Sequence, residues 1–175
     1  MTTIRGQLEV RQPGPGQESE ALRTTLDSQR NHVLGILEGL SEEDLRRPLL
    51  PSGWTCLGLV QHLALDVERF WFRAVVAGEQ VDLESGADAW QVGAGVPARA
   101  VFDLYRQEIA HANVIIAATP PGTAPAWWPD EIFPDLPSRP LRKTILHVIT
   151  ETACHAGHLD VVRELIDNRR WLVLT

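Results

Sequence analysis

The stretch HVITETACHAGHLDVVREL, residues 147–165, carries four potential metal ligands or proton carriers on one helical face. They are spaced by four, four and three residues, so at about 3.6 residues per turn their side chains lie on one side of an α-helix. Apolar residues border the same stripe, which predicts that it points into the protein. Polar groups turned inward need partners, and a metal ion is one. The four residues are His147, Glu151, His155 and His158.

The length and charge of the chain limit the kinds of protein it can be. At 175 residues it fits a single domain over 1–175, of which 1–16 are expected to be a flexible N-terminal segment. A net charge of −7 and a pI near 5.3 argue against a nucleic-acid-binding protein, which needs a basic surface. No stretch reaches the roughly 18 apolar residues of a membrane span, and the start does not resemble a signal peptide. We therefore expect a cytoplasmic protein without nucleic-acid or membrane partners.

Helical spacing of apolar residues predicts four long helices. The first covers about residues 17–39, the second follows the N-cap Thr55 and stops at Gly78, the third begins near Pro97, and the fourth runs from after Pro140 to about Asn168. A short helix over 41–47 is capped by Ser41. Long loops over 79–96 and 119–138 connect the later helices, and the first of them is expected to cover something. Without a convincing strand or repeat, the expected fold is an all-α four-helix bundle.

A metal site can be assembled from the last helix and a facing one. Glu151 and His155 are one helical turn apart, a spacing that lets a carboxylate oxygen and an imidazole nitrogen converge on one cation. Two ligands make a weak site, and His62, in an otherwise apolar part of the second helix, is the candidate for a third. Two histidines and one carboxylate suit zinc, nickel and ferrous iron alike, so the pattern does not select the metal.

Two stretches resemble the DinB-like superfamily of metal-binding four-helix bundles. They are PSGWTCLGLVQHLALDVERFWF, residues 51–72, and LRKTILHVITETACHAGHLDVVRELID, residues 141–167. Related members include mycothiol-dependent maleylpyruvate isomerases and bacillithiol transferases, which hold their metal with a histidine on the second helix and two ligands spaced by four on the last. Carried over, the resemblance implies His62, Glu151 and His155 as metal ligands. A glutamate at 151 resembles the maleylpyruvate isomerase-like members, whereas many DinB-like proteins have histidine there.

The resemblance implies a function as well as a site. We expect a divalent-metal-binding protein, with zinc or nickel favoured over iron or manganese, that uses mycothiol or another low-molecular-weight thiol as a transferase or isomerase. A bound ion lowers the pKa of a thiol or water, which supplies a nucleophile for attack on a small electrophilic substrate. The alternatives are a metal-dependent hydrolase that uses bound water and a non-catalytic metal-binding stress-response protein. A homodimer is compatible with the resemblance. The resemblance does not extend to either long loop, where a substrate pocket would be shaped, so it does not identify the substrate.

Other polar residues have a structural and a functional interpretation. His158 can be a fourth ligand, a partner of a ligand, a proton carrier or simply buried, and His147 is expected to support a ligand or the structure. Arg163 is expected to be solvated at the surface, although it could meet an acidic substrate. His32 and His111 are interpreted as ordinary residues of helix faces.

The cysteines and tryptophans are interpreted mainly as packing residues. Cys154 adjoins His155, but a step of about 100° turns it away from the ligand face, so burial as a small apolar residue is expected. Cys56 opens the second helix, where a helix N-terminus could lower its pKa, yet packing is favoured because no base is nearby. Trp127 and Trp128, on the proline-rich loop, are the candidates for a lid.

Overall fold

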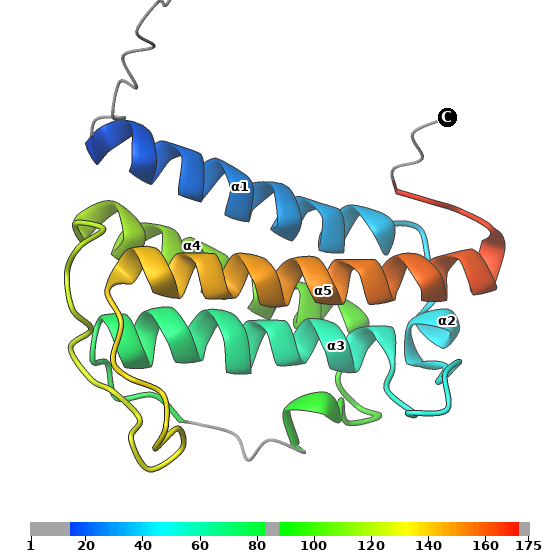
Figure 1. Cartoon of the computed structure of the whole chain (residues 1–175). Coiled ribbons are helices and arrows are strands. Elements are labelled where there is room, and N and C mark those ends of the chain that lie inside the picture. The colour runs from blue at the N-terminus through cyan, green and yellow to red at the C-terminus, as the bar shows by residue number, and fades with distance from the viewer. Residues whose placement is uncertain (1–14, 83–87, 172–175) are drawn as a thin grey trace, which may run out of the picture.

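Four long helical segments form the body of the computed structural model, which describes residues 15–82 and 88–171 (Figure 1). α1 packs mainly against α5, α4 packs against the second helical segment, and α5 also contacts that segment. Among the described residues there is no strand, so the predicted all-α bundle is confirmed. The elements are α1 Pro15–Ile36, α2 Glu42–Arg46, α3 Cys56–His62 continued by η1 Leu63–Val76, η2 Asp88–Trp90, α4 Ala98–Ala118 and α5 Leu141–Asp167.

The helix ends follow the predicted capping signals. The side chains of Ser41 and Thr55 accept hydrogen bonds from the backbone N–H groups of Asp44 and Gly58, respectively. Gly78, in the left-handed region at φ 70°, follows the second segment. Asn168 adopts the left-handed conformation directly after α5. Ser41 and Thr55 thus provide acceptors for N–H groups that a helix leaves unpaired at its start, and Gly78 and Asn168 let the chain turn away at its end.

The first helix differs from its prediction at both ends. It begins at Pro15, and its regular turns end at Ile36, three residues before Gly39. The expected flexible segment therefore loses residues 15 and 16 to the helix, and the remainder, 1–14, lies outside the described residues. Within the described part of the chain, no helix combines the length and apolar character needed to cross a membrane.

The second helical segment is an α-helix only as far as His62. From Leu63 to Val76 it is a π-helix, and its ending is marked by the Ala77 N–H, which donates to the carbonyl of Phe72 five residues earlier at 3.0 Å. A continuous α-helix was expected here, because the segment is apolar on most sides and its period is hard to determine. Ten of the fourteen residues of this π-helix are buried, so burial along it also shows no distinct period.

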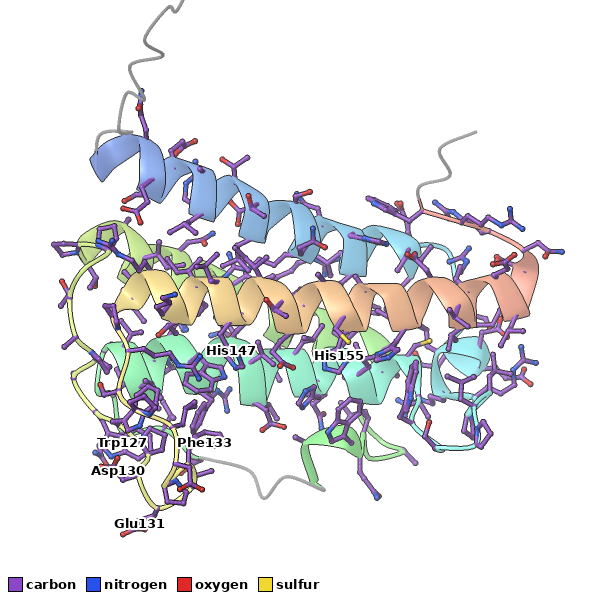
Figure 2. The ribbon with its side chains drawn as sticks, viewed as in Figure 1. Trp127, Asp130, Glu131, Phe133, His147 and His155 are labelled. Carbon is purple, nitrogen blue, oxygen red and sulfur yellow. The ribbon has the colours of Figure 1, made fainter. Side chains whose placement is uncertain are left out.

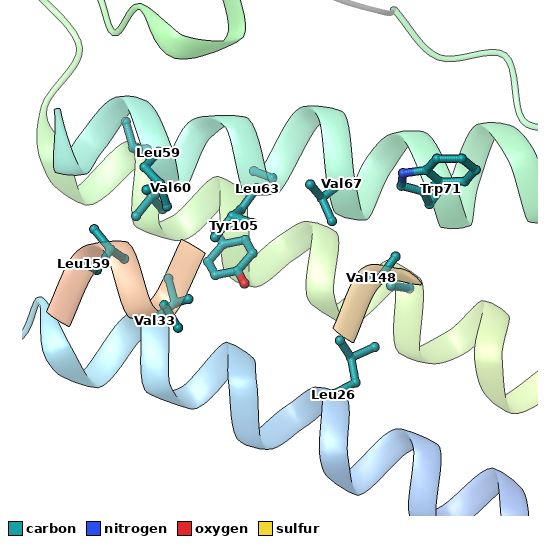
Figure 3. Packing of buried hydrophobic residues seen from close by; sticks show 14 of the residues in the cluster. Leu26, Val33, Leu59, Val60, Leu63, Val67, Trp71, Tyr105, Val148 and Leu159 are labelled. Carbon is teal, nitrogen blue, oxygen red and sulfur yellow. The ribbon is translucent and has the colours of Figure 1, made fainter. Parts of the chain in front are cut away.

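The core contains side chains from all four long segments (Figure 3). Apolar side chains of α1 and α5 meet those of the second segment, with Tyr105 of α4 packed among them. Burial of this apolar surface is the main stabilising contribution to such a bundle. The labelled members of the cluster are Leu26, Val33, Leu59, Val60, Leu63, Val67, Trp71, Tyr105, Val148 and Leu159.

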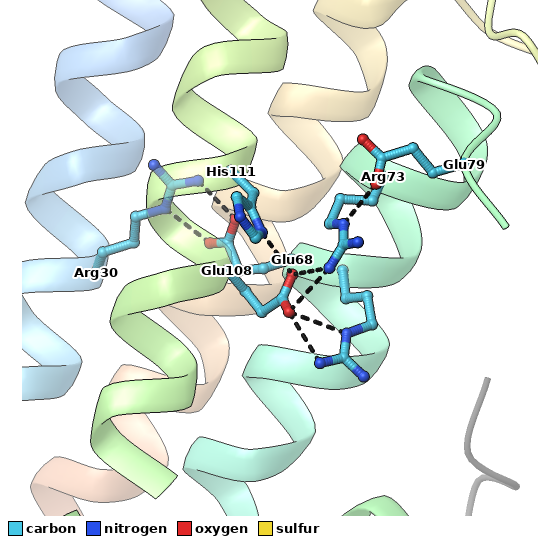
Figure 4. A network of polar contacts seen from close by, with 7 residues as sticks. Arg30, Glu68, Arg73, Glu79, Glu108 and His111 are labelled. Atoms are coloured by element: carbon cyan, nitrogen blue, oxygen red, sulfur yellow. Dashed lines mark hydrogen bonds and ion pairs between the residues drawn. The ribbon is translucent and has the colours of Figure 1, made fainter. Parts of the chain in front are cut away.

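Charged residues are also buried between the helices (Figure 4). Arg30 of α1, 2% exposed, donates from Nε and Nη2 to the two carboxylate oxygens of Glu68 in η1, which is 1% exposed, at 2.7 and 2.6 Å. Arg30 also bonds Asn113 of α4 at 2.8 Å. Glu108 of α4 accepts hydrogen bonds from two arginines of η1, Arg69 and Arg73. The network connects α1, η1 and α4.

Removing one partner of the buried pair should destabilise the fold strongly. We expect Glu68→Ala to lower the free energy of unfolding by about 3–5 kcal/mol, because it removes the buried carboxylate that binds Arg30 and leaves this cation with only Asp27, which is 29% exposed. The double variant Arg30→Met/Glu68→Leu should recover much of this loss. Urea denaturation measures both. Glu20→Ala, which breaks the exposed pair with Arg23, should cost less than about 1 kcal/mol; equal losses in Glu68→Ala and Glu20→Ala would contradict the expectation.

Candidate functional site

The structure brings the three predicted ligands together at the contact between the second segment and α5. His62 is the last residue of α3 and His155 lies in the middle of α5. Their rings meet edge to face, with centroids 5.1 Å apart. Glu151, one turn earlier on α5, places Oε2 3.8 Å from Nε2 of His155. The three side chains therefore lie near one another, and their convergence on one cation stays a prediction.

His62 is oriented by two neighbours. Its Nδ1 lies 2.7 Å from Oδ2 of Asp66, one turn further along the segment, and its ring stacks on Trp90 with centroids 4.2 Å apart. In a neutral imidazole this contact places the proton on Nδ1, because a carboxylate accepts it, and Nε2 then keeps its lone pair for a cation. Sequence reasoning missed Asp66; the spacing of four from His62 was the available signal.

His155 is a half-buried imidazole whose hydrogen-bonding groups are unsatisfied. Burial, and then the charges of His62 and His158, lower its pKa to about 4, so it is neutral at pH 7. Its Nδ1 is buried without a hydrogen-bond partner, and 3.8 Å from Nε2 to Glu151 is too long for a hydrogen bond. Buried polar groups without partners are uncommon, and neutral imidazole is the form that binds metals. The residues present therefore fit a cation.

The donor atoms of His62, Glu151 and His155 are not arranged as a coordination shell. Across residues 15–82 and 88–171, no group of three or more His, Cys, Asp and Glu side chains is close enough to hold an ion. Glu151 is 40% exposed, so its carboxylate is free to turn toward His62 or away from it. The assignment of His62, Glu151 and His155 as ligands therefore remains a prediction, supported by their placement.

The stripe on α5 lies at the margin of the core rather than inside it. Figure 2 shows His147 and His155 on α5, directed toward the second segment. His147, Glu151 and His155 are half-buried and His158 is exposed. The stripe is therefore less buried than expected. The core positions belong to the adjacent face of the helix. They are Val148, Thr152, Ala156, Leu159 and Val162.

The two outer histidines of the stripe have different surroundings. His158 is exposed, which rules out the buried alternative, and its ring lies 5.6 Å from His155 and 6.2 Å from Trp54. His147 packs edge-on against Trp71, with centroids 4.7 Å apart. Burial, and then the charge of Arg139, lower the pKa of His147. His147 thus lies one turn beyond the ligand pair, in an aromatic environment.

A cavity of about 670 Å³ opens next to Trp90, and none of His62, Glu151 and His155 lines it. Trp90 is one of its walls and separates it from His62, so the described part of the 79–96 loop does cover the site, as expected. The loop approaches α3 so closely that a Cβ at Gly58 would clash with the Trp90 carbonyl. The other lining residues are Arg46, Ser52, Gly53, Trp54, Thr55, Gln91, Val92 and Ala94.

Residues 21–168 match the family described as Mycothiol-S-transferase. The chain belongs to the mycothiol-S-transferase family. The match covers most of the chain and includes His62, Glu151 and His155, which confirms the resemblance to the DinB-like superfamily near mycothiol-dependent enzymes. No curated protein matches the chain.

Two residues of this mycothiol-S-transferase family member have the opposite burial to that expected. Cys154 is exposed, because the step of one residue from His155 turns it away from the second segment but toward solvent instead of the core. Arg163, expected at the surface, is 3% exposed. It donates to the carbonyls of Ile36 and Glu38 and so satisfies the end of α1. A substrate-binding role for Arg163 is not supported by these contacts.

The remaining predicted residues lie near their expected positions. His111 is exposed on α4, whereas His32 of α1 lies 2.8 Å from Asp160 of α5 and connects the two helices. Trp127 is 41% exposed, and Trp128 packs against Trp71 with ring centroids 6.0 Å apart. The loop that carries both tryptophans thus lies over the His147 end of the stripe, and its action as a lid remains a prediction.

The different burial of the two cysteines predicts their reactivity. Cys56 is buried, and burial raises its pKa to about 11, so it should be inert in the folded protein, as expected for a packing residue. We expect an aromatic disulfide reagent at pH 8 to modify one thiol rapidly and the second only after denaturant is added. In Cys154→Ser the rapid phase should disappear. Rapid modification of both thiols in the folded state would contradict this arrangement.

The depressed pKa of His155 predicts that the metal-free protein loses stability in mild acid. Its pKa is about 6.5 in the unfolded chain and about 4 in the folded one. Between these two pKa values, His155 binds a proton in the unfolded state but not in the folded state. The free energy of unfolding should therefore fall as pH decreases from 6.5 to 4, by up to about 1.4 kcal/mol per pH unit.

Urea denaturation across this pH range measures the effect. His155→Phe should give a shallower decline than the natural chain, and His111→Ala, at an exposed position, should leave the decline unchanged. An identical slope in His155→Phe would show that His155 titrates alike in both states.

Proposed function

We propose that this protein is a divalent-metal-dependent mycothiol S-transferase or isomerase that acts on a small electrophile. His62, Glu151 and His155 are the proposed ligands, with zinc or nickel favoured and iron or manganese as further candidates. The observation that supports this most directly is the neutral, unpartnered imidazole of His155 beside His62, within the region that matches the family. We also propose a cytoplasmic location and leave a homodimer as a prediction.

The protein's own residues prepare the site for a thiol that comes from outside. Asp66 holds His62 with Nε2 free, and Trp90 covers the His62 ring and limits water there. A divalent ion bound by these side chains would lower the pKa of a thiol and so make it nucleophilic at neutral pH. Such a thiolate would form a sulfur–carbon bond with the electrophile while a leaving group departs with its bonding electrons; in an isomerisation, the same sulfur–carbon bond would break afterwards and release the thiolate.

Two other functions give different results in the same assays. A hydrolase that uses bound water would turn over its substrate without any thiol. A non-catalytic metal-binding stress-response protein would show no turnover, while chelation would lower its melting temperature strongly. The exposed carboxylate of Glu151 and the cavity beside Trp90 support the thiol-dependent function over a closed structural site.

Replacement of the proposed ligands tests the metal site before a substrate is known. We expect elemental analysis to find one divalent ion per chain, and His62→Ala, Glu151→Gln and His155→Ala each to lose most of it. Asp66→Asn should keep the site but weaken metal affinity by roughly 10–100-fold, because it no longer orients His62. Full metal retention in all three ligand variants would overturn the assignment.

Thiol consumption then tests the chemistry. The metal-loaded protein should accelerate the reaction of mycothiol with an aromatic electrophile, and His62→Ala should reduce this rate to the background. His111→Ala, an exposed histidine on another helix, serves as the matched control and should behave as the natural chain. Turnover that is independent of mycothiol would favour the hydrolase instead.

A further inference from the structure

Arg139 is a half-buried cation without an anionic partner. Its guanidinium lies 5.6 Å from the centroid of the Trp71 ring and 5.8 Å from that of Trp128. Its Nε is buried and has no hydrogen-bond partner. Among the described residues, no carboxylate lies within ion-pair distance of Arg139.

Other arginines buried in this protein are paired. Arg30 is bound by Glu68, Arg163 by Asp167, and Arg69 by Glu108. Removing a guanidinium from water without a counter-ion costs free energy. Its unpaired N–H donors match the two oxygens of a carboxylate. Among the buried and half-buried arginines that the structure describes, Arg139 is therefore the one without a carboxylate partner.

The loop that holds Arg139 is anchored in place. The backbone N–H groups of Ala126 and Trp127 donate to the carbonyls of Val76 and Val75, at 3.1 and 3.2 Å, which fastens the loop to the end of η1. Within the loop, Trp128 Nε1 donates to the Leu136 carbonyl at 2.9 Å. A donor on a fixed backbone loses little conformational entropy when it binds a ligand.

The acidic side chains of this loop do not neutralise the arginine. Figure 2 shows Asp130 and Glu131 at the outer edge of the loop, and Asp135 is also exposed. None of the three forms an ion pair with Arg139. The positive charge of the guanidinium is therefore not neutralised by these three carboxylates.

The position of Arg139 relates it to the proposed metal site. Trp71 contacts both Arg139 and His147, and His147 is two turns before His155 on α5. Eight residues of α-helix correspond to about 12 Å along the axis. A small planar molecule held at Arg139 would thus lie at the His147 end of the stripe that carries Glu151 and His155.

The walls near Arg139 suit an apolar, planar body. The Phe133 ring stacks on Trp71, with centroids 5.8 Å apart and planes inclined by 14°, and Trp128 lies 6.0 Å from Trp71. Aromatic faces of this kind pack against planar ligands, while an arginine fixes one charged end.

We propose that Arg139 binds the carboxylate of the electrophilic substrate and that the substrate is a small aromatic carboxylic acid. This inference rests on the proposed thiol-dependent function for the reaction, but not for the binding. With a chlorodinitrobenzoate whose chlorine is para to the carboxylate, the thiolate sulfur forms the bond to carbon, the carbon–chlorine bond breaks, and chloride leaves.

A matched pair of electrophiles tests the assignment through kinetics. The chlorodinitrobenzoate and its methyl ester differ in the carboxylate charge. Arg139→Gln should raise KM for the acid by roughly ten-fold or more and leave KM for the ester unchanged, because the lost hydrogen bonds are to a charged group. Arg139→Lys, which keeps the charge but not the fork, should lie between. Arg142→Gln, which removes a half-exposed arginine at the same helix start, should change neither.

A binding measurement decides the proposal without turnover. Dinitrobenzoate, which has no leaving group, should quench the tryptophan fluorescence of the natural chain at lower concentrations than its methyl ester does. This preference should vanish in Arg139→Gln and persist in Arg142→Gln. If the preference is present but mycothiol is never consumed, the proposed function fails and the carboxylate site stands. An equal effect of Arg139→Gln on acid and ester, or no effect on either, would overturn the site.

Discussion

Along the contact between the second segment and α5, turns of a π-helix face turns of an α-helix. His62 lies opposite His155, and nine residues later Trp71 lies opposite His147, eight residues earlier on α5. The wider π turn accommodates the extra residue, so each level of the contact keeps one side chain from each helix. A regular α-helix would rotate Trp71 away from His147. The π-helix thus places the histidine pair and the aromatic environment in one line.

The buried ion pair complements this register. Glu68 projects from η1 to Arg30 of α1, while Asp66, two residues earlier, reaches back to His62. A rotation of η1 about its axis that moved His62 away from His155 would also separate Glu68 from Arg30. Because an unpaired buried charge is costly, the ion pair contributes to the orientation of the site as well as to stability.

Much of the fold could be predicted from the sequence, because caps and periodic apolar residues are local signals. Ser41, Thr55, Gly78 and Asn168 mark ends that the structure confirms. The histidine and glutamate spacing on α5 placed Glu151 and His155 on one face, and the His155 ring lies beside that of His62; their role as metal ligands stays a prediction. The match to the mycothiol-S-transferase family agrees with the resemblance carried by those residues.

The rest depended on contacts between distant parts of the chain. The π-helix was hidden because an almost uniformly apolar segment shows no distinct period. The burial of Arg163 follows from the end of α1, about 125 residues away in sequence, which provides the carbonyls that it binds. The stacking of Arg139 on Trp71 and Trp128 likewise depends on contacts between separate parts of the chain, which the sequence around Arg139 does not indicate.

The outward orientation of Cys154 has a chemical consequence. The chain has two cysteines, one sealed in the core and one facing solvent from the side of α5 away from the histidine pair. Neither cysteine thus faces an electrophile held between His62 and His155. An electrophile that is free in solution can still reach Cys154, whereas the core shields Cys56 from it.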